Sequence, residues 1–153
     1  MSEVEVSDGP EATAALGARI AAELSPGDVV LVSGELGSGK TTLIRGACHA
    51  LGVAEQVVSP TFTIGRRYRG GVPVSHLDLY RLEGAGLEAE DPGLLDDYLT
   101  PDAISFIEWP AAAVPELGRD DVRVAREIEL RHAGGARREI SVSAPVAGPP
   151  EPS

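Results

Sequence analysis

Asparagine is absent from this chain of 153 residues, and lysine, cysteine and tryptophan occur once each. Without asparagine the chain cannot carry an Asn-Lys-x-Asp motif, which excludes a GTPase that reads guanine through it. The one cysteine, Cys48, cannot form an internal disulfide, so we expect a reducing, cytoplasmic environment and a small buried thiol. No apolar run approaches the roughly 20 residues of a membrane span, and residues 1–7 are too acidic and polar for a secretory signal.

Positive charge is also scarce, because 13 Lys and Arg stand against 24 Asp and Glu, a formal net charge of −11. This balance argues against a protein that grips nucleic acid along a broad basic face. It leaves room for a local basic cluster, and Arg66, Arg67 and Arg69 form one. The sequence does not decide whether that cluster meets RNA phosphates, an acidic protein partner or only solvent.

The single lysine stands in a glycine-rich segment. Every other cationic position is an arginine, whereas Lys40 completes the pattern G-x-x-x-x-G-K-[ST] in Gly34-Glu35-Leu36-Gly37-Ser38-Gly39-Lys40-Thr41. A compact ammonium suits a narrow place between phosphates better than a flat guanidinium does. Main-chain N–H groups of such a loop, together with the start of the following helix, cradle phosphates, and the Thr41 hydroxyl is suited to Mg²⁺. We therefore expect a nucleoside triphosphate at residues 34–42, which include Thr42.

Hydrophobic patterning places this segment between a strand and a helix, as the motif requires. It predicts strands at 4–6, 29–33, 57–69 (broken at Ser59-Pro60), 72–79, 103–108, 122–131 and 137–143, and helices at 10–24, 41–51 and about 94–98. Gly70-Gly71 and Gly134-Gly135 are hairpin signals. We expect one domain over residues 1–144 and a disordered, Pro-rich tail over 145–153.

Two carboxylates end predicted strands and are candidates for the metal and the hydrolytic water. Glu108 follows the cleaner apolar run and is the preferred metal-site acid, whereas Asp78 is preferred for positioning the metal shell or the attacking water. Thr61 lies in Ser59-Pro60-Thr61-Phe62-Thr63, where a switch that senses the γ-phosphate would stand. Trp109 could pack over a nucleotide or a partner, or simply belong to the core. His49, His76 and His132 lack metal-ligand spacing, so we expect structural or surface roles.

Four motifs together resemble one family. The P-loop, Ser-Pro-Thr-Phe-Thr at 59–63, His-Leu-Asp-Leu-Tyr-Arg-Leu at 76–82 and Glu-Trp-Pro at 108–110 have the order and spacing of the bacterial TsaE (YjeE) family. These are small P-loop ATPases of tRNA threonylcarbamoyladenosine synthesis. The resemblance covers about residues 4 to 143, and residues 12–17 also resemble the family's first helix.

The resemblance implies an α/β fold, a P-loop NTPase-like, mostly parallel sheet flanked by helices with added antiparallel strands. It implies ATP and Mg²⁺ as cofactors, slow hydrolysis by the protein alone, and TsaB and TsaD as partners whose complex is reset by hydrolysis, with tRNA reached only through that complex. Carried over to this sequence, the implied roles are phosphate binding for Lys40, Mg²⁺ binding for Thr41 and Glu108, support of hydrolysis for Asp78, the switch for Thr61, a place near the nucleotide for Trp109 and a place near adenine for Thr13.

Two other functions fit the P-loop. A small-molecule kinase would need an acceptor pocket and usually an arginine-bearing lid, and the acidic 83–97 stretch has no arginine. A non-hydrolysing nucleotide-dependent regulator would differ only in whether Asp78 and Glu108 support turnover.

Overall fold

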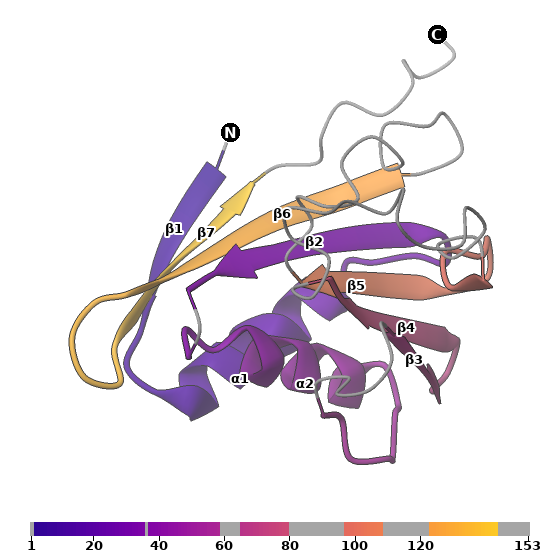
Figure 1. The fold of residues 1–153 in the computed structure, drawn as a ribbon, viewed down its shortest axis with the longest axis horizontal. Coiled ribbons are helices and arrows are strands. Elements are labelled where there is room, and N and C mark those ends of the chain that lie inside the picture. Colours follow the sequence, from indigo (N-terminus) through magenta and orange to yellow (C-terminus); the bar gives the residue numbers. More distant parts are fainter. Residues whose placement is uncertain (1, 36, 59–64, 80–96, 109–122, 144–153) are drawn as a thin grey trace, which may run out of the picture.

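The computed structural model describes residues 2–35, 37–58, 65–79, 97–108 and 123–143, which form a seven-stranded sheet and two helices (Figure 1). The strands lie in the order β1-β7-β6-β2-β5-β4-β3. In chain order the elements are β1 (Ser2–Ser7), α1 (Pro10–Ala21), β2 (Asp28–Gly34), α2 (Lys40–Ala50), β3 (Gly65–Arg69), β4 (Pro73–Asp78), β5 (Ile104–Glu108), β6 (Arg123–His132) and β7 (Arg138–Ser143).

The middle of the sheet is parallel and its margins are antiparallel. β2 runs parallel to β5 on one side and to β6 on the other, and β4 runs parallel to β5. β3 joins β4 as a hairpin, while β7 pairs antiparallel with both β6 and β1. The predicted α/β class, with a mostly parallel sheet and added antiparallel strands, is therefore confirmed.

Both described helices cover the same face of the sheet (Figure 1). Alternate residues of β2, such as Val30 and Val32, point to this face and pack with Leu43 and Ile44 of α2. Cys48 is fully buried in the same core, as expected, and burial raises the pKa of its thiol to about 12. No helix within the described ranges is both long enough and apolar enough to cross a bilayer.

The two helices approach each other unusually closely at a pair of glycines. A Cβ added at Gly17 of α1 would lie 2.0 Å from the Leu43 carbonyl oxygen, and one added at Gly46 of α2 would lie 2.0 Å from that of Ala14. Neither distance is compatible with a real side-chain carbon, so the backbones of α1 and α2 are in direct contact there. This contact fixes α1 against the helix that starts at the P-loop.

The element limits differ from the predictions in a few places. The first helix ends at Ala21 rather than at residue 24, because the Glu23 and Leu24 N–H groups bond three residues back, to Ile20 and Ala21. Both glycine-pair hairpins are present, and Gly134 and Gly135 have φ of +104° and +56°. The expected strand over 57–69 was wrong at its start, because Val57 and Val58 are not in a strand: the Val57 carbonyl accepts a hydrogen bond from Arg45 Nε, and the Val58 N–H donates to Tyr68 Oη. Its strand portion begins at Gly65, and residues 59–64, most of the expected 94–98 helix and the tail lie outside the described residues.

Candidate functional site

The glycine-rich segment connects β2 to α2 at the carboxyl end of a central parallel strand. Gly34 and Gly39 have φ of +149° and +104°, which residues with side chains rarely adopt. A Cβ at Gly34 would lie 2.5 Å from the Leu130 carbonyl oxygen and 2.7 Å from Ser38 Oγ, so the loop packs directly on β6. α2 begins at Lys40, and its positive dipole end faces the loop. This is the position at which open α/β sheets bind ligands.

Lys40 folds back over its own loop. Its ammonium donates hydrogen bonds to the carbonyl oxygens of Gly34 at 2.8 Å and Glu35 at 2.9 Å, and the residue is only 5% exposed. Burial lowers the pKa of Lys40, and the negative charges of Glu108 and Asp78 oppose that shift. The opposing effect shows that one cation from α2 and two carboxylates from β5 and β4 share one electrostatic environment.

The two carboxylates end neighbouring strands. Asp78 is directly opposite Glu108 in the β4–β5 register, and Glu108 is opposite Val32 near the end of β2. Glu108 is 2% exposed, whereas Asp78 is half-buried. Both acids therefore lie at the same edge of the sheet as the P-loop, with the more buried one on the adjacent strand.

His76 joins this group, which the sequence reasoning missed. It is fully buried on β4, and its Nε2 lies 2.6 Å from Glu108 Oε2. Among the described residues, its Nδ1 has no hydrogen-bond partner. Absence of metal-ligand spacing was the wrong criterion, because His76 contacts a carboxylate. The available signal was its place two residues before Asp78, since alternate residues of a strand point to the same face.

Thr13 lies in the first turn of α1 and is buried beside the P-loop. Its Oγ1 is 2.7 Å from Ser7 Oγ, and its methyl carbon would be 3.6 Å from a Cβ built on Gly39. Thr41 and Thr42 are half-buried in the first turn of α2, and the Glu35 side chain is exposed. Leu36, Thr61 and Trp109 lie outside the described residues, so their predicted roles stay predictions.

The donors gathered here fit a polyphosphate. Ser38 Oγ is buried without a hydrogen-bond partner among the described residues, and a Cβ at Gly37 would meet nothing within 4 Å. A loop with an unused hydroxyl, open space and a helix amino end satisfies the chemistry of an anion site. The described residues contain no group of three or more His, Cys, Asp or Glu that could hold a metal. A Thr hydroxyl and one carboxylate suit Mg²⁺, which keeps several waters and phosphate oxygens as ligands.

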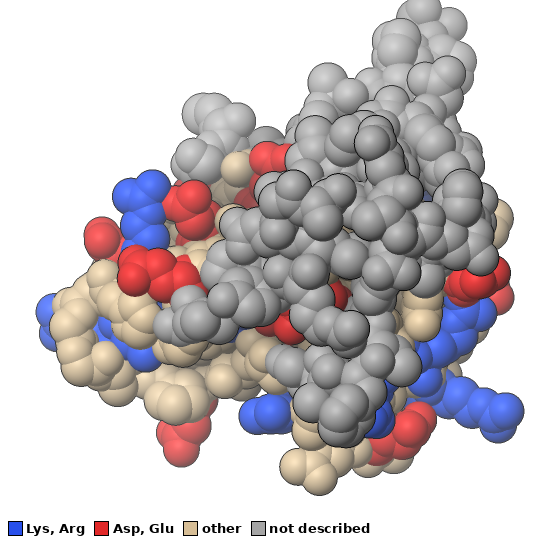
Figure 2. All heavy atoms as spheres, in the orientation of Figure 1, with Lys and Arg blue, Asp and Glu red and all other residues tan. Residues whose placement is uncertain are grey.

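The arginine cluster lies at the opposite edge of the sheet from β1. Arg66, Arg67 and Arg69 are exposed on β3, and Figure 2 shows Lys and Arg atoms gathered at that edge. Arg67 donates a hydrogen bond to the Asp97 carbonyl. None of these contacts identifies a partner, so the question that the sequence left open stays open.

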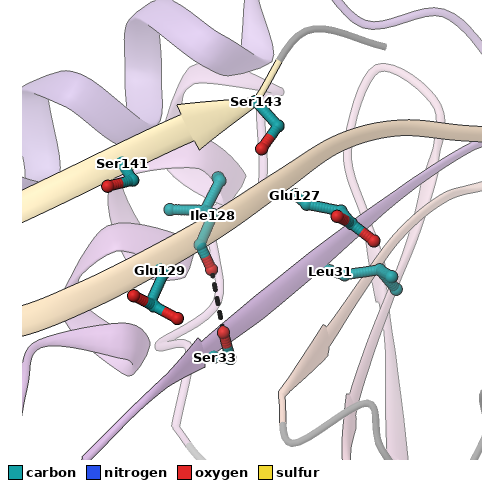
Figure 3. A pocket seen from close by; sticks show the side chains of 7 residues that line it. All are labelled: Leu31, Ser33, Glu127, Ile128, Glu129, Ser141 and Ser143. Carbon is teal, nitrogen blue, oxygen red and sulfur yellow. Dashed lines mark hydrogen bonds between the residues drawn. The ribbon is translucent and has the colours of Figure 1, made fainter. Parts of the chain in front are cut away.

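A separate pocket of about 290 Å³ lies over β2, β6 and β7 (Figure 3). Within the described ranges it has no lysine or arginine in its lining, which consists of Leu31, Ser33, Glu127, Ile128, Glu129, Ser141 and Ser143. Glu129 Oε1 already accepts a hydrogen bond from Arg131 Nε at 2.6 Å. The described lining, with two carboxylates and no cation, does not suit phosphate.

Known proteins resemble this chain over most of its length. The family model described as "Threonylcarbamoyl adenosine biosynthesis protein TsaE" matches residues 7–140. A protein of Bacillus subtilis (strain 168) named "tRNA threonylcarbamoyladenosine biosynthesis protein TsaE" is 38% identical over 136 residues, which cover 88% of this chain and 81% of the relative. A protein of the same name from Streptomyces coelicolor is 40% identical over 131 residues, covering 84% and 87%. A crystal structure of YdiB from Bacillus subtilis matches with a TM-score of 0.76 and 31% identity over 94% of this chain and 86% of that chain.

Proposed function

Because the chain belongs to the TsaE family, we propose that it binds ATP and Mg²⁺ at the P-loop and hydrolyses ATP in support of tRNA threonylcarbamoyladenosine synthesis. One observation carries the chemical part of this proposal: Asp78 and Glu108 end adjacent parallel strands beside the P-loop, at the edge of the sheet where Lys40 begins α2. That arrangement gives a phosphate cradle and two acids from adjacent strands, which phosphoryl chemistry needs.

Each residue has a proposed task. Lys40 exchanges its bonds to the loop carbonyls for contacts with the outer phosphates, and N–H groups of the loop and of the first turn of α2 bind the remaining phosphate oxygens. The Thr41 hydroxyl and the Glu108 carboxylate hold Mg²⁺, which when bound neutralises developing negative charge on the phosphates. Asp78, less buried and one strand further away, orients the attacking water.

The remaining site proposals rest on the family resemblance. Thr61 acts in the switch, Trp109 lies near the nucleotide, and Leu36 contributes a main-chain N–H to the loop. Thr13 lies near the adenine end, which its place beside Gly39 supports. Its hydroxyl is engaged by Ser7, so Thr13 would contact the nucleotide through its methyl group.

The partner proposal follows from the family alone. We place the protein in the cytoplasm with TsaB and TsaD, where hydrolysis resets their complex between rounds of tRNA modification. The name shared by the relatives supports the pathway, and the P-loop supports the use of ATP.

Exchange of Lys40 for Ala tests the nucleotide site. Calorimetry should show ATP binding by the unmodified protein and none by Lys40→Ala, because the sole ammonium of the loop is lost. Arg19→Ala is the matched control, since Arg19 is an exposed cation of α1 paired with Glu5 at 2.9 Å. Equal affinity of the Lys40 variant would remove this site from the proposal.

Exchange of Asp78 for Asn tests hydrolysis separately. Turnover should fall about a hundredfold while ATP still binds, because a water-orienting carboxylate acts in the reaction rather than in binding. Asp102→Asn is the control, since Asp102 is an exposed acid at the amino end of β5. If Asp78→Asn hydrolyses ATP normally, Asp78 is not the water-orienting residue. If the unmodified protein did not hydrolyse ATP either alone or with TsaB and TsaD, the alternative of a non-hydrolysing nucleotide-dependent regulator would be favoured.

Mixing the protein with TsaB and TsaD tests the pathway. We expect ATP hydrolysis to accelerate and tRNA modification to proceed through many rounds only when all three proteins and ATP are present. Lys40→Ala serves as the control that keeps the surface of the protein but removes the nucleotide. No complex and no stimulation would separate this protein from the proposed machinery while leaving its nucleotide site intact.

A further inference from the structure

Arg138, the first residue of β7, bonds the outside of the P-loop. Its Nε donates to the Ser38 carbonyl oxygen at 3.1 Å, and its Nη2 donates to that of Gly37 at 3.1 Å. About 100 residues of chain separate Arg138 from these two glycine-rich loop positions. The planar fork of a guanidinium matches two adjacent carbonyls, a geometry that an ammonium does not reproduce.

The same guanidinium is anchored at its other end. Its Nη1 donates to the carbonyl oxygens of Gly135 at 2.7 Å and Arg137 at 2.8 Å, both in the β6–β7 hairpin. Arg138 is half-buried, and its backbone is in register with His132 of β6 and Ser7 of β1. The side chain is therefore bonded both to the P-loop and to its own hairpin, and it is not a flexible surface arginine.

The two carbonyl bonds matter because of the geometry of the peptide unit. In a trans peptide the C=O and N–H point in opposite directions, so a carbonyl fixed from outside aims its partner N–H inward. The bond to the Ser38 carbonyl thus directs the Gly39 N–H, at the start of α2, toward the inside of the loop. The Ser38 N–H donates to the Glu35 carbonyl oxygen at 3.0 Å and so closes a turn. The bond from Arg138 to the Gly37 carbonyl supports this turn, because that carbonyl and the Ser38 N–H belong to the same peptide unit.

The β6–β7 hairpin and its strands also pack directly against the P-loop. Gly34 packs on the Leu130 carbonyl of β6, and Leu130 Cδ2 would lie 3.5 Å from a Cβ built on Gly39. Arg138 adds to these contacts by donating to the Gly37 and Ser38 carbonyl oxygens.

We propose that Arg138 is a positioning residue for the nucleotide: its guanidinium fork locks residues 37–39 in the phosphate-binding conformation, so the β6–β7 hairpin is part of the site. This inference rests on the proposed function, because it presumes that the P-loop binds ATP. Arg138 acts through the loop backbone and needs no contact with the nucleotide.

Two variants of Arg138 separate positioning from charge. Arg138→Gln removes the charge and the fork, whereas Arg138→Lys keeps the charge but not the fork. We expect both to weaken ATP and ADP binding about tenfold, since hydrogen bonds from a charged donor are lost. Arg137→Gln is the matched control, because Arg137 lies in the same hairpin and its exposed side chain has Nε 3.7 Å from Asp8 Oδ1 and no hydrogen bond or ion pair with the P-loop among the described residues. The affinity of this variant should stay within about twofold of that of the unmodified protein.

Calorimetry measures the affinities for ATP and ADP. Steady-state ATPase assays measure KM and kcat separately, and melting curves of the nucleotide-free variants show whether each variant is folded. Positioning predicts a raised KM with kcat at saturating ATP nearly unchanged, and faster amide hydrogen exchange at residues 37–39. Normal affinity of Arg138→Lys with weak binding by Arg138→Gln would show that charge alone acts, and overturns the inference. Normal affinity of both also overturns it. Failure of the unmodified protein to bind ATP would instead overturn the proposed function itself.

Discussion

Replacement of Gly46 by Ala tests the packing that holds the P-loop helix in place. In the middle of α2 the change would ordinarily stabilise the helix by about 1 kcal/mol, because alanine has the higher helix propensity. Here the added Cβ would lie 2.0 Å from the Ala14 carbonyl oxygen, 2.6 Å from its carbonyl carbon and 2.7 Å from its Cα. All three are backbone atoms of α1, so no side-chain rotation relieves the clash.

The helices must therefore move apart by more than an ångström at their crossing. Overpacking of this kind costs about 1–3 kcal/mol, and a backbone clash belongs at or above the upper end. After the propensity gain is subtracted, we expect the free energy of unfolding to fall by about 2 kcal/mol. For a chain of this size the melting temperature should drop by about 4–8 °C.

Urea and thermal unfolding, followed by circular dichroism, measure this loss. Gly9→Ala is the matched control, because a Cβ there meets nothing within 4 Å and φ is 176°, an extended conformation open to any residue. We expect that control to lose about 1 kcal/mol or less, because alanine is a somewhat weaker helix N-cap than glycine. If Gly46→Ala were as stable as the unmodified protein or more so, the direct backbone contact of α1 and α2 would be refuted.

Three further results are expected. The Cys48 thiol should resist iodoacetamide in the native protein and react in urea, because burial raises its pKa to about 12 and excludes the reagent; rapid native labelling would contradict this. ATP should bind most tightly while Lys40 is charged, and its affinity should fall as the pH rises through the pKa of Lys40. Because burial lowers that pKa, the decline in affinity should begin below pH 10.5, which calorimetry at a series of alkaline pH values measures. His76→Ala should lower the free energy of unfolding by about 3–5 kcal/mol, because it strands the buried Glu108 carboxylate, and adding Glu108→Ala should cost less than the sum of the two single changes.

Local sequence signals predicted the parts of the fold that depend on neighbouring residues. The β2–loop–α2 unit follows from an apolar run, a P-loop pattern and a helical stripe, and the Gly134-Gly135 turn follows from glycine's access to positive φ. The strand order does not follow, because pairing of β2 with β6 joins segments about a hundred residues apart and leaves no mark in local periodicity.

The same distinction applies to the site. The placement of Asp78 and Glu108 at one edge of the sheet could be predicted, because each ends an apolar run of a parallel strand. The contact of Arg138 with the loop carbonyls could not be predicted, because only the folded sheet creates it. The contact of His76 with Glu108 also depends on the folded sheet, and the sequence indicated only that His76 shares a strand face with Asp78. The roles of Thr61 and Trp109 stay predictions, since both lie outside the described residues.

The pairing of β1 with β7 has a consequence during synthesis on the ribosome. Among the described strands β1 has β7 as its only neighbour, and β6 and β7 also supply Leu130 and Arg138 to the outer side of the P-loop. At the usual elongation rate, the roughly 100 residues between loop and hairpin take about 5–20 s to be added. If Arg138 positions the P-loop as proposed, a nascent chain that already contains Lys40 must wait for its last strands before it can bind a triphosphate tightly.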